Sequence, residues 1–93
     1  MPSFDIAHIQ EQGNYLIIVP VADSFEYQSV EDQVDIMEEL QMHARSAGLL
    51  GEVVAVWRSG RRMMYMGPPH WQDLLRSLSM DLVSANVNKT LSW

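Results

Sequence analysis

The chain contains two short strand hairpins, and an amphipathic helical pattern follows each of them. The first hairpin spans residues 5–21 around Gly13-Asn14, and the second spans residues 52–66 around Ser59-Gly60. Helical patterns run over residues 29–47 and from about 69 to 88. This order predicts an α+β fold: a two-layer sandwich in which two helices cover one face of an antiparallel sheet of four to five strands.

The element order ββαββα, with an optional last strand at residues 88–93, fits two topologies. If residues 90–93 pair in the sheet, residues 15–93 read β-α-β-β-α-β, the ferredoxin-like arrangement. If the strand at residues 5–12 instead takes the edge beside residues 15–19, the fold is a circular permutation of that sandwich. Only one of the two strands can occupy this edge in one subunit. The other is then free to extend the sheet, cross to a second subunit or lie on the surface, which favours a homodimer.

Composition predicts one small domain with apolar surface to spare. The 93 residues suit a single domain, and 47% of them are hydrophobic, which is generous for a monomer of this size. The absence of cysteine excludes disulfides and thiolate chemistry. The first residues lack a basic, apolar leader, and the apolar run over residues 15–22 is too short to cross a bilayer. We therefore expect a cytoplasmic protein without membrane attachment.

Charge is unevenly distributed along the chain. The net charge of −6 argues against nucleic-acid binding, because phosphate contacts need clustered Lys and Arg. Residues 1–47 carry nine acidic and one basic side chain, whereas residues 48–93 carry three acidic and five basic ones. Such an asymmetry can steer head-to-tail contacts or orient the protein on a partner. A single acidic, solvated helix face explains the same imbalance.

The most specific local signal is the basic turn Arg58-Ser59-Gly60-Arg61-Arg62. A two-residue Ser59-Gly60 turn would place Arg58 opposite Arg61, and directly opposed like charges destabilise a hairpin. Guanidinium groups bind carboxylates and phosphates in bidentate fashion. Arg58, Arg61 and Arg62 are therefore predicted to contact an anion: a carboxylate of the acidic helix, a phosphate or a partner's acid. The alternative is an exposed turn whose arginines point into water.

Aromatic and titratable residues supply the remaining candidates. Large aromatic side chains anchor many interfaces, and we predict this role for Trp57, Tyr65, Trp71 and Trp93. His70 lies where the second helix begins and is, with Tyr65, a candidate for an acid–base catalytic group. Trp71 and Arg62 would be further residues of the same candidate active site. The alternative for His70 is a capping or packing role.

No metal or cofactor is predicted. Asp35, Glu39 and His43 share one helix face at the spacing i, i+4, i+8, which suits metal ligands, but a solvated face with one Glu–His pair accounts for the same pattern. The methionines follow the strand and helix periods, which is typical of core and interface residues.

Two functions fit these observations, since no phosphate-binding loop, nucleophile elbow or zinc motif is present. The first is a small, acidic, self-associating interaction or regulatory domain that binds a protein partner or a small anionic ligand. The alternative is a small cofactor-free enzyme, similar to oxygenases or isomerases, with a pocket between helices and sheet. Recognition of single-stranded RNA by the sheet ranks last, because few basic residues are available.

Overall fold

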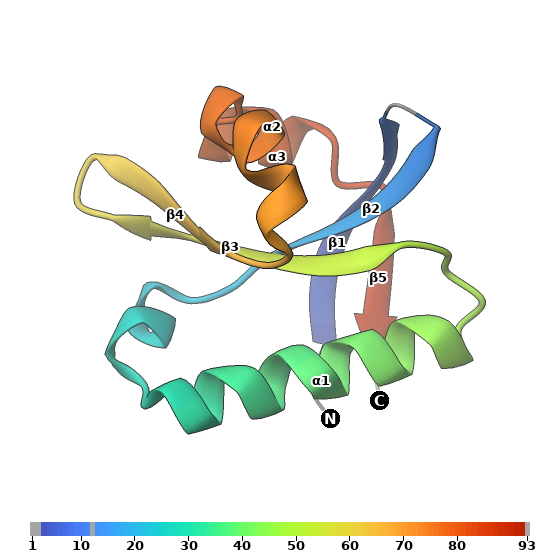
Figure 1. The fold of residues 1–93 in the computed structure, drawn as a ribbon, viewed down its shortest axis with the longest axis horizontal. Helices are drawn as coiled ribbons and strands as arrows, with labels where there is room; N and C mark the ends of the chain where they lie inside the picture. The colour runs from blue at the N-terminus through green and yellow to red at the C-terminus, as the bar shows by residue number, and fades with distance from the viewer. Residues whose placement is uncertain (1–2, 12, 93) are drawn as a thin grey trace.

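A computed structural model describes residues 3–11 and 13–92, with the side chains of residues 11 and 70 outside the description (Figure 1). Its five strands form one sheet in the order β4-β3-β2-β1-β5. The strands are β1 (Ser3–Glu11), β2 (Asn14–Pro20), β3 (Glu52–Ser59), β4 (Arg62–Met66) and β5 (Lys89–Ser92). The α-helices are α1 (Val30–Ser46), α2 (Gln72–Ser77) and α3 (Met80–Ala85), and two 3-10 helices are η1 (Asp23–Tyr27) and η2 (Pro69–Trp71).

The sheet is mixed. The α+β class is confirmed, but the prediction of a purely antiparallel sheet is wrong, because β2 and β3 run parallel with Ile17 opposite Val53. The other three neighbouring pairs are antiparallel. The connection between β2 and β3 contains the 17-residue helix α1, which is long enough to return the chain to the same end of the sheet. The ferredoxin-like strand order and its circular permutation are not confirmed.

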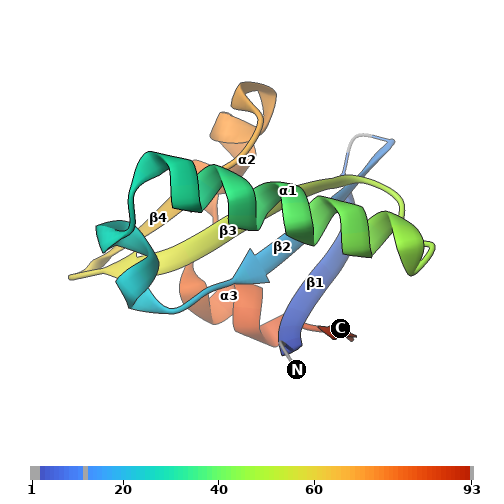
Figure 2. The same cartoon turned by 90° about the horizontal axis from the view of Figure 1, so that it is seen from below.

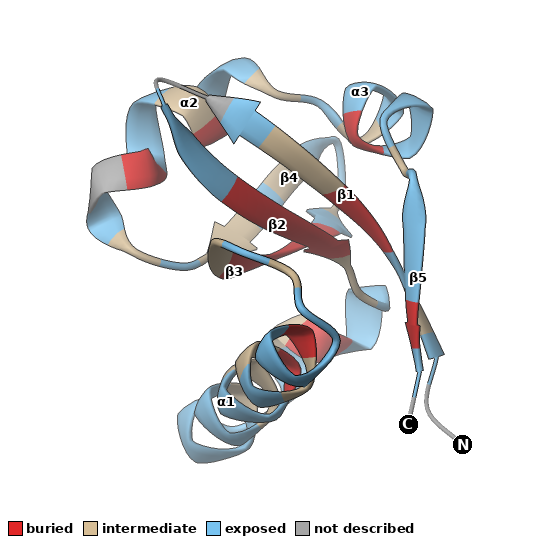
Figure 3. Cartoon of the chain, turned by 90° about the vertical axis from the view of Figure 1, so that its right-hand side faces the viewer, coloured by how far each residue is buried: buried red, intermediate tan, exposed pale blue. Residues whose placement is uncertain are grey.

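Helices cover both faces of the sheet, contrary to the expected two-layer arrangement. Figure 2 shows α1 lying across one face of the sheet. On this face, Leu40 and Ala44 of α1 pack in one cluster with Ile17 and Val53. Figure 3 shows α2 and α3 on the opposite side of the sheet from α1. Side chains of η2, α2 and α3 pack there against the alternate strand residues, in a cluster that comprises Ala7, Leu16, Ile18, Val54, Val56, Trp71, Leu75 and Val83. The strands β4 and β5 lie at opposite edges of the sheet, so the segment that joins them must cross a whole face.

The neighbouring strands β2 and β3 are buried on both faces of the sheet, which is typical of continuous apolar runs. Residues 16–19 of β2 and residues 53–57 of β3 are all buried. Regular pairing of β2 ends at Pro20, as expected of a residue without an N–H. Both faces therefore have a core, and the central strands contribute to each.

The helix α1 begins and ends where its sequence indicates. The Oγ atom of Ser29 accepts a hydrogen bond from the backbone N–H of Asp32 at 3.1 Å, which caps the first turn. The helix ends at Ser46, and Gly48 then adopts a φ of +79°, which glycine adopts without steric cost. These local signals suffice because capping and termination depend on neighbouring residues alone.

The second helical pattern is interrupted. Instead of one helix over residues 69–88, the chain forms η2, α2 and α3, with a break at Leu78-Ser79. The Ser77 hydroxyl donates to the Leu74 carbonyl at 2.6 Å, and Leu78 is extended with a ψ of 157°. Ser79 then caps α3 by accepting from the Leu82 N–H at 3.2 Å. Closely spaced serine hydroxyls compete for the backbone hydrogen bonds of a helix. They therefore favour the end of one helix and the start of another over one continuous helix.

The last strand extends the sheet within the same subunit. Residues 89–92 pair antiparallel with residues 3–6 of β1, so β1 lies between β2 and β5. The strand left over after pairing of β1 with β2 was expected to extend the sheet, cross to a second subunit or lie on the surface. The structure shows that this strand, β5, extends the sheet. In the part of the chain that the structure describes, every helix is too short or too polar to cross a lipid bilayer.

Candidate functional site

The hairpin formed by β3 and β4 carries the basic turn, but its two-residue loop lies one residue further along the chain than predicted, which shifts the strand pairing by two residues. Ser59 pairs with Arg62 and Arg58 pairs with Met63, so the two-residue loop is Gly60-Arg61. The predicted opposition of Arg58 and Arg61 is therefore wrong. Glycine at the first loop position, with a φ of +62°, matches the backbone that tight hairpin turns require there.

Strand alternation places Arg58 on the face that α2 and α3 cover. Val54 and Val56 belong to the core cluster on that face, and Arg58 follows them at the same two-residue spacing. Its cross-strand partner Met63 packs against the same cluster. The arginine thus stands at the end of a row of apolar side chains, where the hairpin extends beyond the core.

A groove with a volume of about 500 Å³ lies between this hairpin and the connection from α2 to α3. We call it the arginine groove. One wall is the hairpin, and the other is the segment around the helix break. Its lining residues are Arg58, Gly60, Arg61, Arg62, Met63, Leu78, Ser79, Met80 and Asp81.

The three arginines of the groove have no carboxylate partner among the residues that the structure describes. All are exposed, and among the described residues no carboxylate oxygen lies within 4.0 Å of the nitrogens of Arg58, Arg61 or Arg62. Glu26 of η1 does reach the hairpin, where it accepts hydrogen bonds from the Ser59 hydroxyl at 2.7 and 2.9 Å. Three like charges close to one turn repel one another, and a bound anion would relieve this repulsion.

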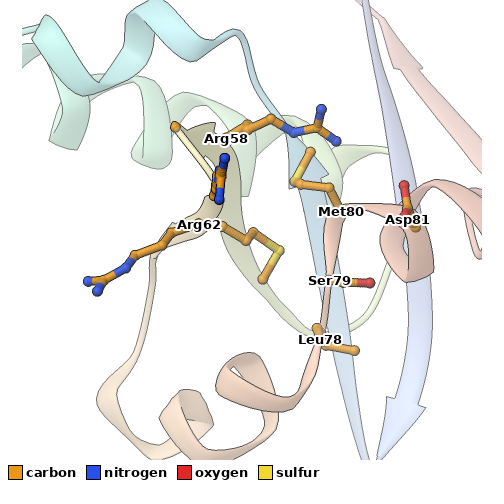
Figure 4. Close-up of a pocket in the computed structure, with 9 residues that line it drawn as sticks. Arg58, Arg62, Leu78, Ser79, Met80 and Asp81 are labelled. Carbon is orange, nitrogen blue, oxygen red and sulfur yellow. The ribbon is translucent and has the colours of Figure 1, made fainter.

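The arginines differ in how they face the groove. In Figure 4, Arg58 extends towards the wall that holds Met80 and Asp81, whereas Arg62 extends away from it. Asp81 is exposed and is the one acidic residue among the nine that line the groove. Its charge works against a bound anion. The groove therefore combines guanidinium donors, apolar contact surface and one repulsive carboxylate at its edge.

The predicted aromatic anchors mostly lie inside the subunit. Trp57 and Trp71 are only 6% and 5% exposed. The ring of Trp57 lies 4.9 Å from that of Phe25, and this contact holds η1 on the sheet. Tyr65 is half-buried against the same core cluster as Trp71. Trp93 lies outside the described residues, and an interface role for these four residues stays a prediction.

The residues suggested for catalysis are not gathered around a pocket that the structure describes. The side chain of His70 lies outside the described part of the chain. A small cavity of about 130 Å³ does lie between α3 and the sheet, but its lining is apolar apart from Asn86 and includes neither Tyr65 nor Arg62. The enzyme alternative therefore stays a hypothesis.

No cluster of three or more His, Asp or Glu side chains in the described residues is arranged to hold a metal ion. Of Asp35, Glu39 and His43 on α1, the last two lie close together: Glu39 Oε1 and His43 Nε2 are 4.0 Å apart. This is the Glu–His pair that a solvated helix face without a metal would contain.

One wall of the arginine groove is not predictable from the apolar pattern. That pattern places Leu78, Met80 and Asp81 in one continuous helix, and nothing local connects them with the basic turn. The serines on either side of Leu78 are the signal that the sequence offers, because they mark the break that creates this wall.

Comparison of the chain with family models, with curated protein sequences and with solved structures finds no match. Function is therefore inferred from the geometry of the groove and from the distribution of charge.

Proposed function

We propose that this protein is a small interaction domain that binds an acidic segment of a partner protein in the arginine groove. The observation that supports the proposal is the set of three arginines, without carboxylate partners among the described residues, at the edge of a groove of about 500 Å³. Guanidinium groups bind carboxylates strongly when both are partly withdrawn from water.

The apolar contribution of the groove favours a peptide over a simple ion. Met63, Leu78 and Met80 line it beside the arginines, and methionine adapts readily to the shape of a bound side chain. A partner that matches this surface carries carboxylates next to aliphatic side chains. Contacts of this kind are transient and steered by charge, which suits an interaction or regulatory domain.

The test uses nuclear magnetic resonance with a defined probe. The ¹⁵N-labelled protein is titrated with a synthetic helical peptide of unrelated sequence that carries Glu at i, i+4 and i+7 and Val beside them. We expect amide shifts confined to residues 58–63 and 78–81. The triple variant R58A/R61A/R62A should lose at least about tenfold in affinity, which corresponds to about 1.4 kcal/mol.

Arg76→Ala is the matched control, because Arg76 is an exposed arginine of α2 that does not line the groove. Its affinity should equal that of the wild type. Shifts spread over the whole surface, or equal loss of affinity in both variants, would contradict a specific groove.

A further inference from the structure

A second surface of the same chain has the chemistry that the arginine groove needs in a ligand. On α1, Glu31, Asp35 and Glu38 follow the spacing i, i+4, i+7 and are all exposed. Because this spacing places side chains on one helix face, they form a row, which we call the acidic stripe. The row extends over about 10 Å along the helix axis.

The acidic stripe points away from its own sheet and has no basic partner in the described part of the chain. Leu40 and Ala44 bury the opposite side of α1. Among the described residues, no basic nitrogen lies within 4.0 Å of the carboxylates of Glu31, Asp35 or Glu38. Within residues 3–11 and 13–92, three carboxylates therefore lack a cationic partner and three guanidinium groups lack an anionic one.

Exposed apolar residues lie beside the acidic stripe. On α1, Val30 is 73% exposed and Val34 on the next turn is 38% exposed, and Tyr27 at the end of η1, which precedes α1 in the chain, is 85% exposed. Large apolar side chains that stay in water next to charged ones are typical of association surfaces. They match the apolar lining that Met63, Leu78 and Met80 give to the arginine groove.

We infer that the arginine groove binds the acidic stripe of a second copy of this chain, so that subunits associate head to tail. The inference rests on the proposed function, because it takes the groove as a site for an acidic, partly apolar helix. Charge complementarity and the matching apolar residues identify the occupant. The guanidinium groups gain carboxylates that the described part of their own subunit does not supply.

The positions of the two surfaces determine the kind of assembly. Figure 1 shows α1 on one side of the sheet and α2 and α3 on the other. The acidic stripe lies on the side of α1 that faces away from the sheet, and the connection from α2 to α3 lines the groove, so the two surfaces belong to opposite faces. Two subunits related by a twofold axis do not satisfy both contacts at once when the surfaces lie on opposite faces. Such a heterologous contact instead adds subunits in one direction, into a ring or an open chain.

The experiment measures mass by sedimentation velocity for the wild type and two variants. The groove variant is R58A/R61A/R62A, and the stripe variant is E31Q/D35N/E38Q, which preserves side-chain shape. We expect the wild-type mass to rise beyond that of a dimer with concentration and to fall at 0.5 M salt, where the Debye length is about 4 Å. Each variant alone should be monomeric.

Mixing the two variants provides the decisive result. One retains an intact stripe and the other an intact groove, so an equimolar mixture should form a heterodimer that grows no further. Circular dichroism checks that both variants are folded, and R76A should associate like the wild type.

A dimer that both variants retain would overturn the inference, because it would show a different, self-complementary interface. A wild type that stays monomeric while its groove binds the synthetic acidic peptide would overturn it too, and would leave the proposed function intact. If the groove binds neither the peptide nor a second copy, both proposals fail.

Discussion

The side-chain amide of Asn88 pairs with the backbone of His8 as a neighbouring strand would. The His8 N–H donates to Asn88 Oδ1 at 3.0 Å, and Asn88 Nδ2 donates to the His8 carbonyl at 2.9 Å. The backbone N–H of Asn88 also donates to the carbonyl of Ile6 at 3.1 Å. Asn88 directly precedes β5, and its side chain thus extends the hydrogen bonding between β1 and β5 by one further residue of β1.

Replacing Asn88 with alanine should weaken the attachment of β5. Both side-chain hydrogen bonds are solvent-exposed, so the expected loss is about 1–2 kcal/mol in the free energy of unfolding. Hydrogen exchange followed by nuclear magnetic resonance should show faster exchange in β5 than in β2. The control is Thr90→Ala on the same strand, whose hydroxyl makes one exposed hydrogen bond to Asp5 at 3.3 Å. Equal effects of both substitutions would contradict the role assigned to Asn88.

Gly51 should tolerate no side chain. It has a φ of +118°, and a Cβ atom there would lie 2.5 Å from the carbonyl oxygen of Tyr15. Gly51→Ala should therefore cost about 3 kcal/mol or more, since steric overlap with backbone adds to an unfavourable φ. Gly48→Ala is the matched control, because its φ of +79° is also unfavourable but the space around it is open. We expect about 1 kcal/mol there. Urea unfolding measures both, and similar losses would contradict the close approach of Gly51 to Tyr15.

Gln41 joins α1 to the start of β3. Its Nε2 donates to the Gly51 carbonyl at 3.1 Å, and its Oε1 accepts from the Val53 N–H at 2.9 Å. Gln41→Ala should destabilise the fold by about 2 kcal/mol, because two half-buried backbone groups lose their partners. Met42→Ala, at a neighbouring position that is 55% exposed, should change stability by less than about 0.5 kcal/mol. Thermal unfolding distinguishes the two, and a larger loss for Met42→Ala would refute the assignment.

Asp81→Asn should strengthen binding in the arginine groove. The substitution removes the one negative charge among the lining residues and retains the size of the side chain. For the synthetic acidic peptide we expect about two- to fivefold tighter binding, as is usual for one exposed charge. Asp73→Asn on α2, outside the groove, should leave the affinity unchanged. Titration calorimetry at low salt measures both, and weaker binding by the Asp81 variant would show that this carboxylate does not oppose the ligand.

Features that depend on neighbouring residues were predictable from the sequence. The two strand hairpins were evident, and within them the apolar residues 16–19 and 53–57 are buried, as continuous apolar runs favour. Ser29 and Gly48 marked the ends of α1, and the turn around Gly60 marked the second hairpin. The clustering of Arg58, Arg61 and Arg62 was also evident, because three cations in five residues must lie together in any fold.

Features that depend on distant residues were decided by the tertiary structure. Two strands buried on both faces are compatible with several strand orders. The parallel pairing of β2 and β3 arises because α1 returns the chain to the end of the sheet at which β2 begins. The path from β4 to β5 then has to cross the face that α1 does not cover, and this brings Asp81 to the edge of a groove begun by Arg58. Sequence by itself determined which residues are charged, capped or apolar. Packing of both sheet faces determined which of them meet, because burial free energy depends on the whole core and not on any local segment.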